Sequence, residues 1–241
     1  MKRYVLAGSS KAIATTTYNV PYSLSTSMYN YGSILDCLCP PAGESSFGRS
    51  LNLYSAGRTL AEPAFWSWVA KNKPSFTANS VVPDGIFGRT LADKESDAST
   101  KSSIGALKAA LAGQWDAAPL KMGTLFRLQE YLPLVLTHVF PGYYIDVQDT
   151  ARLLVAGIAL TSIANERIFA HNSRASWNTL RQDDRDLRPD LVTGEDEHVI
   201  GIELSDTHED IQRAGGILRQ VGQLGFNAKI DILRDFLGSV Y

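Results

Sequence analysis

Apolar residues recur at spacings of three and four over much of the chain after residue 50. Two such stripes have these members: Ile104, Leu107, Leu111 and Trp115 in the first, and Leu125, Leu128, Leu132, Val135 and Val139 in the second. This spacing places the apolar side chains on one face of a helix. The pattern therefore predicts two amphipathic helices, the second kinked at Pro133.

Two further helices are predicted from their first turns. Thr59 and Glu62 have the spacing of a capping box, and the helix that follows is expected to end near Asn72. Asp146 is expected to cap a helix that runs to about Phe169. That segment is apolar nearly all round over 153–164 and predicts the central buried helix.

The carboxyl-terminal part of the chain alternates between polar and periodic segments. Residues 170–197 are polar and predict a loop, and 199–204 predict a short strand. Helices are expected over 207–222 and from about 227 to the end. Gly215-Gly216 lies inside the first of these helices and indicates either a hinge or a break, since two glycines weaken a helix.

The first 50 residues have a different pattern. Residues 9–33 are rich in Ser, Thr and Tyr and contain no acidic residue, and 13–20 favour extended chain. We therefore expect an extended N-terminal arm over 1–50, with one or two short strands, and a single mainly helical domain over 51–241. The predicted fold class is mainly α, a compact multi-helix core with an extended arm and minor β content.

Composition and charge argue against a disordered protein and against one that binds nucleic acid through its overall charge. Of the 241 residues, 44% are hydrophobic and 20% are charged, which suits a packed core and excludes disorder. The net charge of −2 argues against a protein that binds nucleic acid by its bulk charge, although a local basic groove stays open. The two cysteines, Cys37 and Cys39, are too close in sequence for a good disulfide, which fits a reducing compartment.

Charge is distributed unevenly along the chain. Residues 1–60 carry five basic and two acidic groups, for a net +3, whereas 183–210 carry two basic and eleven acidic groups, for a net −9. A basic arm and an acidic tail could dock head-to-tail between copies. A solvated acidic loop explains the same pattern, and both interpretations stay open.

The leading functional hypothesis is a non-enzymatic self-assembling structural protein of the viral nucleocapsid or coat type, without a cofactor. It predicts a homo-oligomer formed through the arm, with an interface at Tyr18, Tyr22, Tyr29 and Trp68. It also predicts a groove for single-stranded nucleic acid lined by Lys121, Arg127, Arg152, Arg167 and Arg174. No segment is long and apolar enough to span a membrane, so we expect an intracellular protein, in the cytoplasm or in a virion. A monomeric protein-interaction module that uses the acidic stretch 183–210 is a further alternative.

One segment carries a resemblance to a known family. The residues Arg188-Pro189-Asp190, followed by Ile200-Gly-Ile-Glu203-Leu-Ser205, resemble the core of the PD-(D/E)xK nuclease superfamily. The resemblance implies that Asp190 and Glu203 bind Mg²⁺ or Mn²⁺ and that the protein is a metal-dependent nuclease or an inactive relative. Ser205 stands where the family has its lysine.

Other motifs support no specific chemistry. Ala7-Gly8-Ser9-Ser10-Lys11 hints at a phosphate loop but lacks the spacing of a P-loop, so an ordinary turn is expected there. The chain contains no G-x-S-x-G elbow, so nothing in it points to a serine hydrolase.

Overall fold

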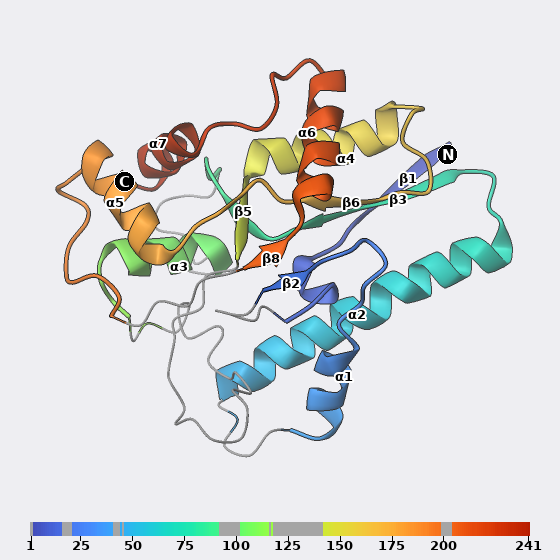
Figure 1. The fold of residues 1–241 in the computed structure, drawn as a ribbon, viewed down its shortest axis with the longest axis horizontal. Helices are drawn as coiled ribbons and strands as arrows, with labels where there is room; N and C mark the ends of the chain where they lie inside the picture. Colours follow the sequence, from blue (N-terminus) through green and yellow to red (C-terminus); the bar gives the residue numbers. More distant parts are fainter. Residues whose placement is uncertain are drawn as a thin grey trace.

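A parallel sheet of three strands, in the order β1-β3-β6, lies at the centre of the computed structural model (Figure 1). The structure describes residues 2–15, 21–40, 44, 46–91, 102–115, 117, 142–198 and 204–241. The sheet is built from β1 (Arg3–Ala7), β3 (Thr77–Pro83) and β6 (Arg167–Ala170). Ala7 pairs with Val81, and Pro83 pairs with Ala170, so the three strands point the same way.

The other elements are short strands and helices around this sheet. Their bounds are η1 (Ser10–Ala12), β2 (Tyr22–Ser23), α1 (Tyr31–Leu38), α2 (Ser46–Asn72), β4 (Gly85–Phe87), α3 (Ser102–Leu111), β5 (Tyr143–Asp146), α4 (Val147–Ala159), β7 (Ser173–Arg174), α5 (Trp177–Leu187), β8 (Ser205–Asp206), α6 (His208–Gln220) and α7 (Lys229–Val240). Strands β2 and β8 pair in parallel, and β5 pairs with both β4 and β7.

Helices cover both faces of the central sheet because side chains alternate along each strand. Asn79 points toward α4, where its amide donates to the carbonyl oxygen of Gly157 (2.9 Å). The next residue, Ser80, points the other way and donates to Glu62 on α2 (2.7 Å). The sheet therefore lies between α4 and α6 on one face and α2 with η1 on the other.

Gly157 allows α4 to lie close to β1. A Cβ atom at this position would lie 2.8 Å from Cγ2 of Val5, closer than real Cβ contacts. The carbonyl oxygen of Gly157 also accepts from Nε of Arg3 (3.2 Å). The absence of a side chain at Gly157 therefore permits the close approach of helix α4 and strand β1.

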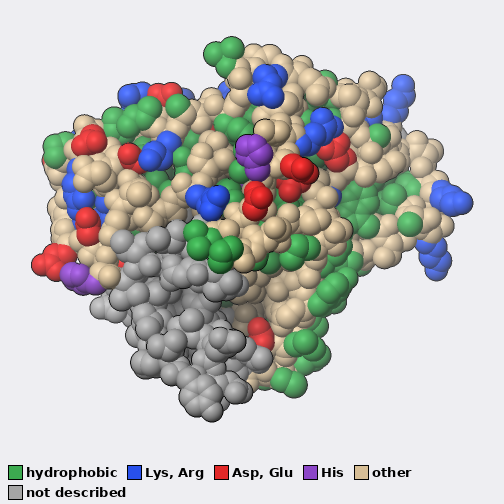
Figure 2. All heavy atoms as spheres, viewed as in Figure 1, with side chains coloured by type: hydrophobic (Ala, Val, Ile, Leu, Met, Phe, Trp, Pro, Cys, Tyr) green, Lys and Arg blue, Asp and Glu red, His purple; other side chains and the backbone are tan. Residues whose placement is uncertain are grey.

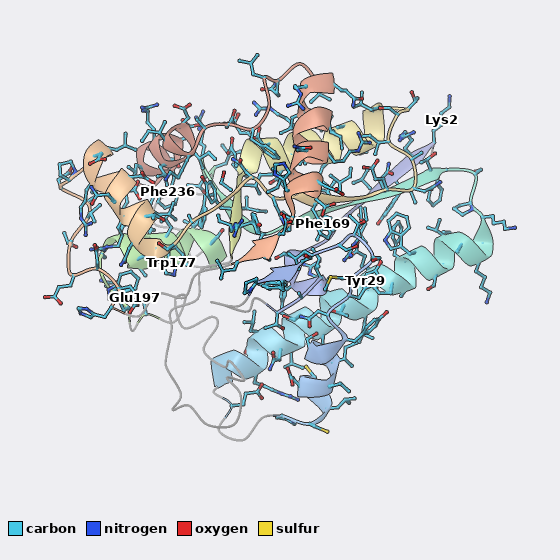
Figure 3. The ribbon with its side chains drawn as sticks, in the orientation of Figure 1. Lys2, Tyr29, Phe169, Trp177, Glu197 and Phe236 are labelled. Carbon is cyan, nitrogen blue, oxygen red and sulfur yellow. The ribbon has the colours of Figure 1, made fainter. Side chains whose placement is uncertain are left out.

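A second apolar cluster lies away from the central sheet. It is formed by α3, α5 and α7 together with β4 and β5. Trp177 and Phe236 belong to it, and both lie at the end of the molecule where these three helices gather (Figure 3). The described residues therefore form a core between the sheet and its helices, a second core at this helical end, and a small cluster of Ile13, Val82 and Phe169.

The expected mainly α fold with an extended N-terminal arm is wrong. The structure is an α/β arrangement in which β1 forms one edge of a parallel sheet, while η1 and α1 pack against α2. α2 begins at Ser46 and runs through residue 50, so Thr59 and Glu62 lie inside a helix rather than at its start. The boundary predicted between 1–50 and 51–241 stays a prediction.

Some of the predicted helices are found in the structure, and one ends earlier than predicted. Those at 207–222 and from about 227 are found as α6 and α7. Asp146 is the N-cap of α4, as predicted, and its carboxylate accepts a hydrogen bond from the backbone N–H of Gln148 (3.2 Å). However, α4 ends at Ala159, and the chain reverses at Asn165 (φ 55°) to enter β6. The second apolar stripe and the strand expected at 199–204 lie largely outside the described residues.

Membrane insertion finds no support in the described part of the chain. No helix there combines the length and the apolar character that a bilayer crossing needs.

Candidate functional site

Three segments that follow strands β1, β3 and β6 meet at the carboxyl edge of the central sheet. Lys11 lies after β1, Asp84 directly after β3 and His171 directly after β6. Together with Tyr143 and Ser205 they line a small hollow. Open α/β sheets bind their ligands outside the carboxyl ends of the strands, so this hollow is the candidate site.

Asp84 provides the buried carboxyl group of the hollow, with 7% of its side chain exposed. One carboxylate oxygen accepts from the hydroxyl of Ser10 (2.7 Å) and lies 3.9 Å from Nζ of Lys11. The other accepts from the backbone N–H of Tyr143 (3.0 Å). Burial raises the pKa of Asp84, and the Lys11 charge and these hydrogen bonds act in the opposite direction. The carboxylate thereby connects the segments after β1 and β3 to β5.

His171 is a deeply buried polar side chain of the hollow, with 1% of its surface exposed. Its ring stacks on Tyr143 (centroids 5.1 Å apart, planes 13° apart) and lies 5.3 Å from the ring of Phe169. Burial lowers the pKa of His171 to about 3, and the Lys11 charge adds to this effect. The imidazole is therefore neutral at physiological pH, when it has one N–H donor and one acceptor nitrogen.

Tyr143 connects the hollow to the segment that precedes α6. Its hydroxyl donates to the carbonyl oxygen of Ser205 (2.7 Å), and its ring lies 5.7 Å from the guanidinium of Arg174. Tyr22, on β2, also lines the hollow, and β2 pairs with β8, which contains Ser205. The hollow is thus closed by elements from both ends of the chain.

The basic residues predicted to bind nucleic acid do not gather in one groove. Lys121 and Arg127 lie outside the described residues. Arg152 pairs with Asp149 on its own helix (2.8 Å). Arg167 is buried, and its two contacts to the carboxylate of Glu62 measure 3.0 and 2.8 Å.

The last member of that set, Arg174, is exposed on β7. Because Arg167 is sealed inside the protein, it has no access to a phosphate backbone. The described residues give no support to a nucleic-acid groove.

The aromatic residues predicted as an interface lie in three different places. Tyr18 is outside the described residues, and Tyr22 lines the hollow. The ring of Tyr29 lies 4.3 Å from the buried guanidinium of Arg167. Trp68 is half exposed on α2 and stacks on Phe76 (6.3 Å).

Hydrophobic side chains gather on the surface over the region of α1 and α2 (Figure 2). Exposed apolar residues of these helices include Tyr31, Leu35, Leu38, Leu53, Leu60 and Trp68. The interface role of Trp68 stays a prediction.

The nuclease-like segment has no metal-site geometry in the described residues. Asp190 is exposed and is held by Arg188, which donates to both of its oxygens (2.8 and 2.6 Å). That ion pair lowers the pKa of Asp190, first through the hydrogen bonds. Glu203 lies outside the described residues, and elsewhere in the described chain no three His, Cys, Asp or Glu side chains gather as metal ligands.

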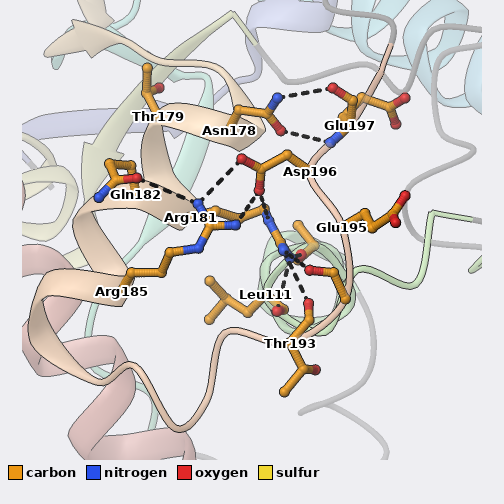
Figure 4. A network of polar contacts seen from close by, with 12 residues as sticks. Leu111, Asn178, Thr179, Arg181, Gln182, Arg185, Thr193, Glu195, Asp196 and Glu197 are labelled. Carbon is orange, nitrogen blue, oxygen red and sulfur yellow. Dashed lines mark hydrogen bonds and ion pairs between the residues drawn. The ribbon is translucent and has the colours of Figure 1, made fainter.

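Part of the acidic stretch 183–210 is used to bury an arginine (Figure 4). Arg181 is wholly buried, and its guanidinium donates to Asp196 (2.8 Å) and to the carbonyl oxygens of Ala110, Leu111, Thr193 and Gly194. Arg185 also donates to Asp196. This segment is therefore bound to α3 and α5 of its own chain, rather than presented as a free acidic surface.

The residues that form the hollow could not be recognised as one site from the sequence. Lys11 and Ser10 were considered only as part of a possible phosphate loop, and no motif pointed to Asp84. His171 carried no motif at all. The one available signal was positional, because each residue follows a strand, and it requires those strands to be recognised.

Comparisons with known proteins bear on this site. Aldehyde reductase 2 of Sporidiobolus salmonicolor is 28% identical over 242 residues, covering 99% of this chain and 63% of that protein. The structure of Gre2 from Candida albicans in complex with NADPH matches with a TM-score of 0.71 at 19% identity, over 100% of this chain and 64% of that one. Vestitone reductase from alfalfa (Medicago sativa L.) matches with a TM-score of 0.61 at 17% identity, over 99% and 64%. No family model matches the chain.

These likenesses show the fold, a Rossmann-like α/β arrangement with a parallel sheet flanked by helices. They overturn the hypothesis of a non-enzymatic coat protein without a cofactor, because the relatives are reductases and one of them holds NADPH. The resemblance to PD-(D/E)xK nucleases, the arm-mediated oligomer, the nucleic-acid partner and the acidic interaction module fail with it. The chain spans a little less than two thirds of the length of these proteins.

The described residues do not fit the diphosphate of a nicotinamide dinucleotide. Such a diphosphate binds at a G-x-G-x-x-G turn and the N-terminus of the helix that follows. The chain has no such motif, and β1 is followed by a single turn of 3-10 helix. The helices α4 and α6 begin with acidic residues, Asp149 in one and Glu209 with Asp210 in the other, which repel phosphate.

Proposed function

We propose that this protein takes part in the NAD(P)H-dependent reduction of an aldehyde or ketone, as a relative of the extended short-chain dehydrogenase/reductase family. In this proposal the described residues form the part of the site that holds the carbonyl compound. The diphosphate of the dinucleotide would be held outside them.

The observation that carries the proposal is the hollow at the carboxyl ends of β1, β3 and β6. It combines buried polar groups with apolar walls, as small-molecule sites do. The likeness to aldehyde reductase 2 extends over nearly the whole chain and so includes every residue of the hollow. Fold alone would not support a function, but a polar hollow at the expected edge of the sheet adds a site.

Reduction of a carbonyl group also requires a proton for its oxygen. The neutral imidazole of His171 is not suited to supply it, because burial keeps the charged form from existing near neutral pH. Tyr54 is a better candidate. It lies on α2, the helix that packs against η1, and the guanidinium of Arg58 lies 5.1 Å from the centre of its ring. This contact places a cation beside the aromatic ring of Tyr54.

The test is a turnover assay with NADPH and NADH and a series of aldehydes and ketones, following the absorbance of the reduced nicotinamide. We expect its consumption to depend on the carbonyl compound. Tyr54→Phe should lower turnover by about two orders of magnitude, as expected for loss of a general acid. Tyr31→Phe changes another exposed tyrosine and is the matched control.

Absence of turnover with every carbonyl compound, from a folded protein, would refute the proposed function. Unchanged turnover in Tyr54→Phe would refute only the role of this tyrosine.

A further inference from the structure

β1 is an edge strand of the central sheet, and its outer side presents backbone groups that β3 does not use. β3 lies on one side of β1, and no described strand pairs with the other side. The carbonyl oxygen of Lys2 and the N–H of Gly8 bond to β3 (3.0 and 2.8 Å). Because backbone groups alternate in direction along a strand, those of Arg3, Val5 and Ala7 point outward. Such an edge is a template for a further strand.

An apolar stripe on α4, called here the α4 stripe, borders this edge on one face of the sheet. It consists of all the exposed residues of α4: Val147, Ala151, Val155, Ile158 and Ala159. Ile158 follows Gly157, which contacts β1. Ile158 also lies opposite Asp149 around the helix, and Asp149 accepts from the backbone of Asn227, beyond α6 (2.7 Å). The α4 stripe therefore faces away from that contact, on the side of β1.

A second apolar stripe, the α2 stripe, borders the same edge on the opposite face of the sheet. Its members are exposed and share one face of the helix: Leu53, Gly57, Leu60, Ala61, Ala64 and Trp68. Phe65 lies beside this stripe, one turn from Ala61, and its ring is 5.4 Å from that of Tyr4 on β1. Between residues 53 and 70, Arg58 is the one charged side chain exposed on α2. The outer edge of β1 thus has exposed apolar side chains on both sides.

A strand beside β1 with a helix on each face would cover all three features. Parallel sheets occur with both faces covered by helices, and large exposed apolar patches mark interaction sites. The relatives contain additional chain of their own. This chain covers 63% of aldehyde reductase 2 and 64% of the Gre2 structure, so about a third of each lies outside the match.

The direction of the added strand determines the kind of partner. A strand parallel to β1 would end at the edge of the sheet where the hollow lies, so the turn after it would lie beside the hollow. In nucleotide-binding α/β units this turn and the helix that follows hold a diphosphate, which the described residues of this chain do not fit. A second copy related by a two-fold axis perpendicular to the sheet would add β1 antiparallel, ending at the other edge.

We propose that the outer edge of β1 and the two stripes bind a separate polypeptide, an α/β nucleotide-binding unit that adds a parallel strand and holds the dinucleotide diphosphate beside the hollow. The identity of the nucleotide as NAD(P)H rests on the proposed function. The chain alone binds NADPH weakly, and the partner lowers the KM for NADPH. The site is therefore completed by two polypeptides.

The experiment measures complex formation separately from turnover. The probe is the part of aldehyde reductase 2 outside its match with this chain, coexpressed as a separate polypeptide with the whole tagged chain. We expect a one-to-one complex, purified through the tag and identified by light scattering. Val155→Glu in the α4 stripe and Ala64→Glu in the α2 stripe each place a charge in the apolar interface and should lower recovery of the probe by about tenfold or more.

A third variant tests the added strand. Ala7→Pro removes an outward N–H without removing a bond to β3, and it should also lower recovery of the probe. Leu224→Glu is the matched control, because it replaces an exposed apolar side chain in the loop after α6, away from both stripes. This variant should bind the probe as the wild type does, and circular dichroism compares the folding of all four variants.

Recovery of the chain without the probe, whether the probe is soluble or not, would overturn the proposal. A complex that survives both glutamate changes, or a dimer of this chain in its place, would overturn it as well. Complex formation without carbonyl-dependent oxidation of NADPH would refute the proposed function and leave the docking surface standing. Turnover by the chain alone, with a KM for NADPH that the probe does not lower, would support the proposed function and refute the two-polypeptide site.

Discussion

The carboxyl group of Asp184 should make the stability of this protein fall as the pH rises. The side chain lies on α5, is 0% exposed, and neither oxygen has a hydrogen-bond partner among the described residues. Burial, with a smaller contribution from the neighbouring charge of Asp183, raises the pKa of Asp184 to about 7. In the unfolded chain the same group has an ordinary pKa near 3.8.

The sign of the effect follows from these two values. Between about pH 4 and pH 7 the folded protein holds a proton that the unfolded chain has released. The contribution of Asp184 to the free energy of unfolding is therefore fully present below about pH 4 and is lost as the pH rises through about 7. A difference of about three pKa units corresponds to about 4 kcal/mol in total, at up to 1.36 kcal/mol per pH unit.

The perturbation is Asp184→Asn, which retains the shape of the side chain and removes its titration. The free energy of unfolding is measured by urea denaturation at intervals from about pH 4 to pH 8, for the wild-type protein and the variant. We expect the difference between variant and wild type to increase by about 3–4 kcal/mol in favour of the variant over this range. Asp186→Asn, an exposed change on the same helix, should follow the wild type throughout.

Subtraction removes the contributions of all other titrating groups, because both proteins share them. The buried amide of the variant changes the free energy of unfolding by an amount that is the same at every pH, because the amide does not titrate. A difference that stays constant from pH 4 to pH 8 would show that Asp184 is ionised in the folded state, and the argument from its burial would be refuted.

Three further changes test the packing around the site. Glu62→Gln leaves the buried guanidinium of Arg167 without its counterion and should lower the free energy of unfolding by about 3–5 kcal/mol, measured by urea denaturation. Gly88→Ala places a Cβ 2.5 Å from Oδ1 of Asp146 at a φ of 115°, so we expect a loss of more than about 1 kcal/mol and a lower melting temperature. Arg181→Met leaves several buried carbonyl oxygens unpaired, and limited proteolysis should then cleave the segment around residue 194 faster than in the wild type.

Some elements could be predicted from the sequence because their patterns were local. The helices α6 and α7 have apolar stripes, and the start of α4 has Asp146 at its N-cap. The end of α4 was missed because the apolar run continues past Ala159. After Ala159 the chain forms a turn that leads into the buried strand β6. Apolar residues occur in helices, turns and buried strands alike, so their presence alone does not show where the helix ends.

The central sheet was missed for a different physical reason. Strands of parallel sheets usually read as continuous hydrophobic runs, because both faces are buried. β3 instead contains Asn79 and Ser80, which are buried yet polar, and β6 begins with the buried Arg167. Each polar side chain has a partner from an element far away in the sequence, so no local window could show that it belongs inside.

The candidate site could not be assembled before those strands were known. Lys11, Asp84, Tyr143, His171 and Ser205 are spread over most of the chain and share no motif spacing. Only the topology brings them to one edge. His171 in particular gives no sequence signal, because its burial without a partner among the described residues is a property of the folded state.

The buried polar residues that obscured the sheet also determine where the site forms. Oε1 of Glu62 accepts from Ser80 on β3 (2.7 Å) and from Nε of Arg167 on β6 (3.0 Å), and these two strand residues are register partners. A slip of one residue would turn β6 over and direct Arg167 into the apolar face under α4 and α6. Because the register also pairs the last residues of both strands, Asp84 and His171 emerge side by side at the carboxyl edge. The same slip would turn His171 away from the hollow, so the ion pair on the face toward α2 positions the imidazole four residues further along.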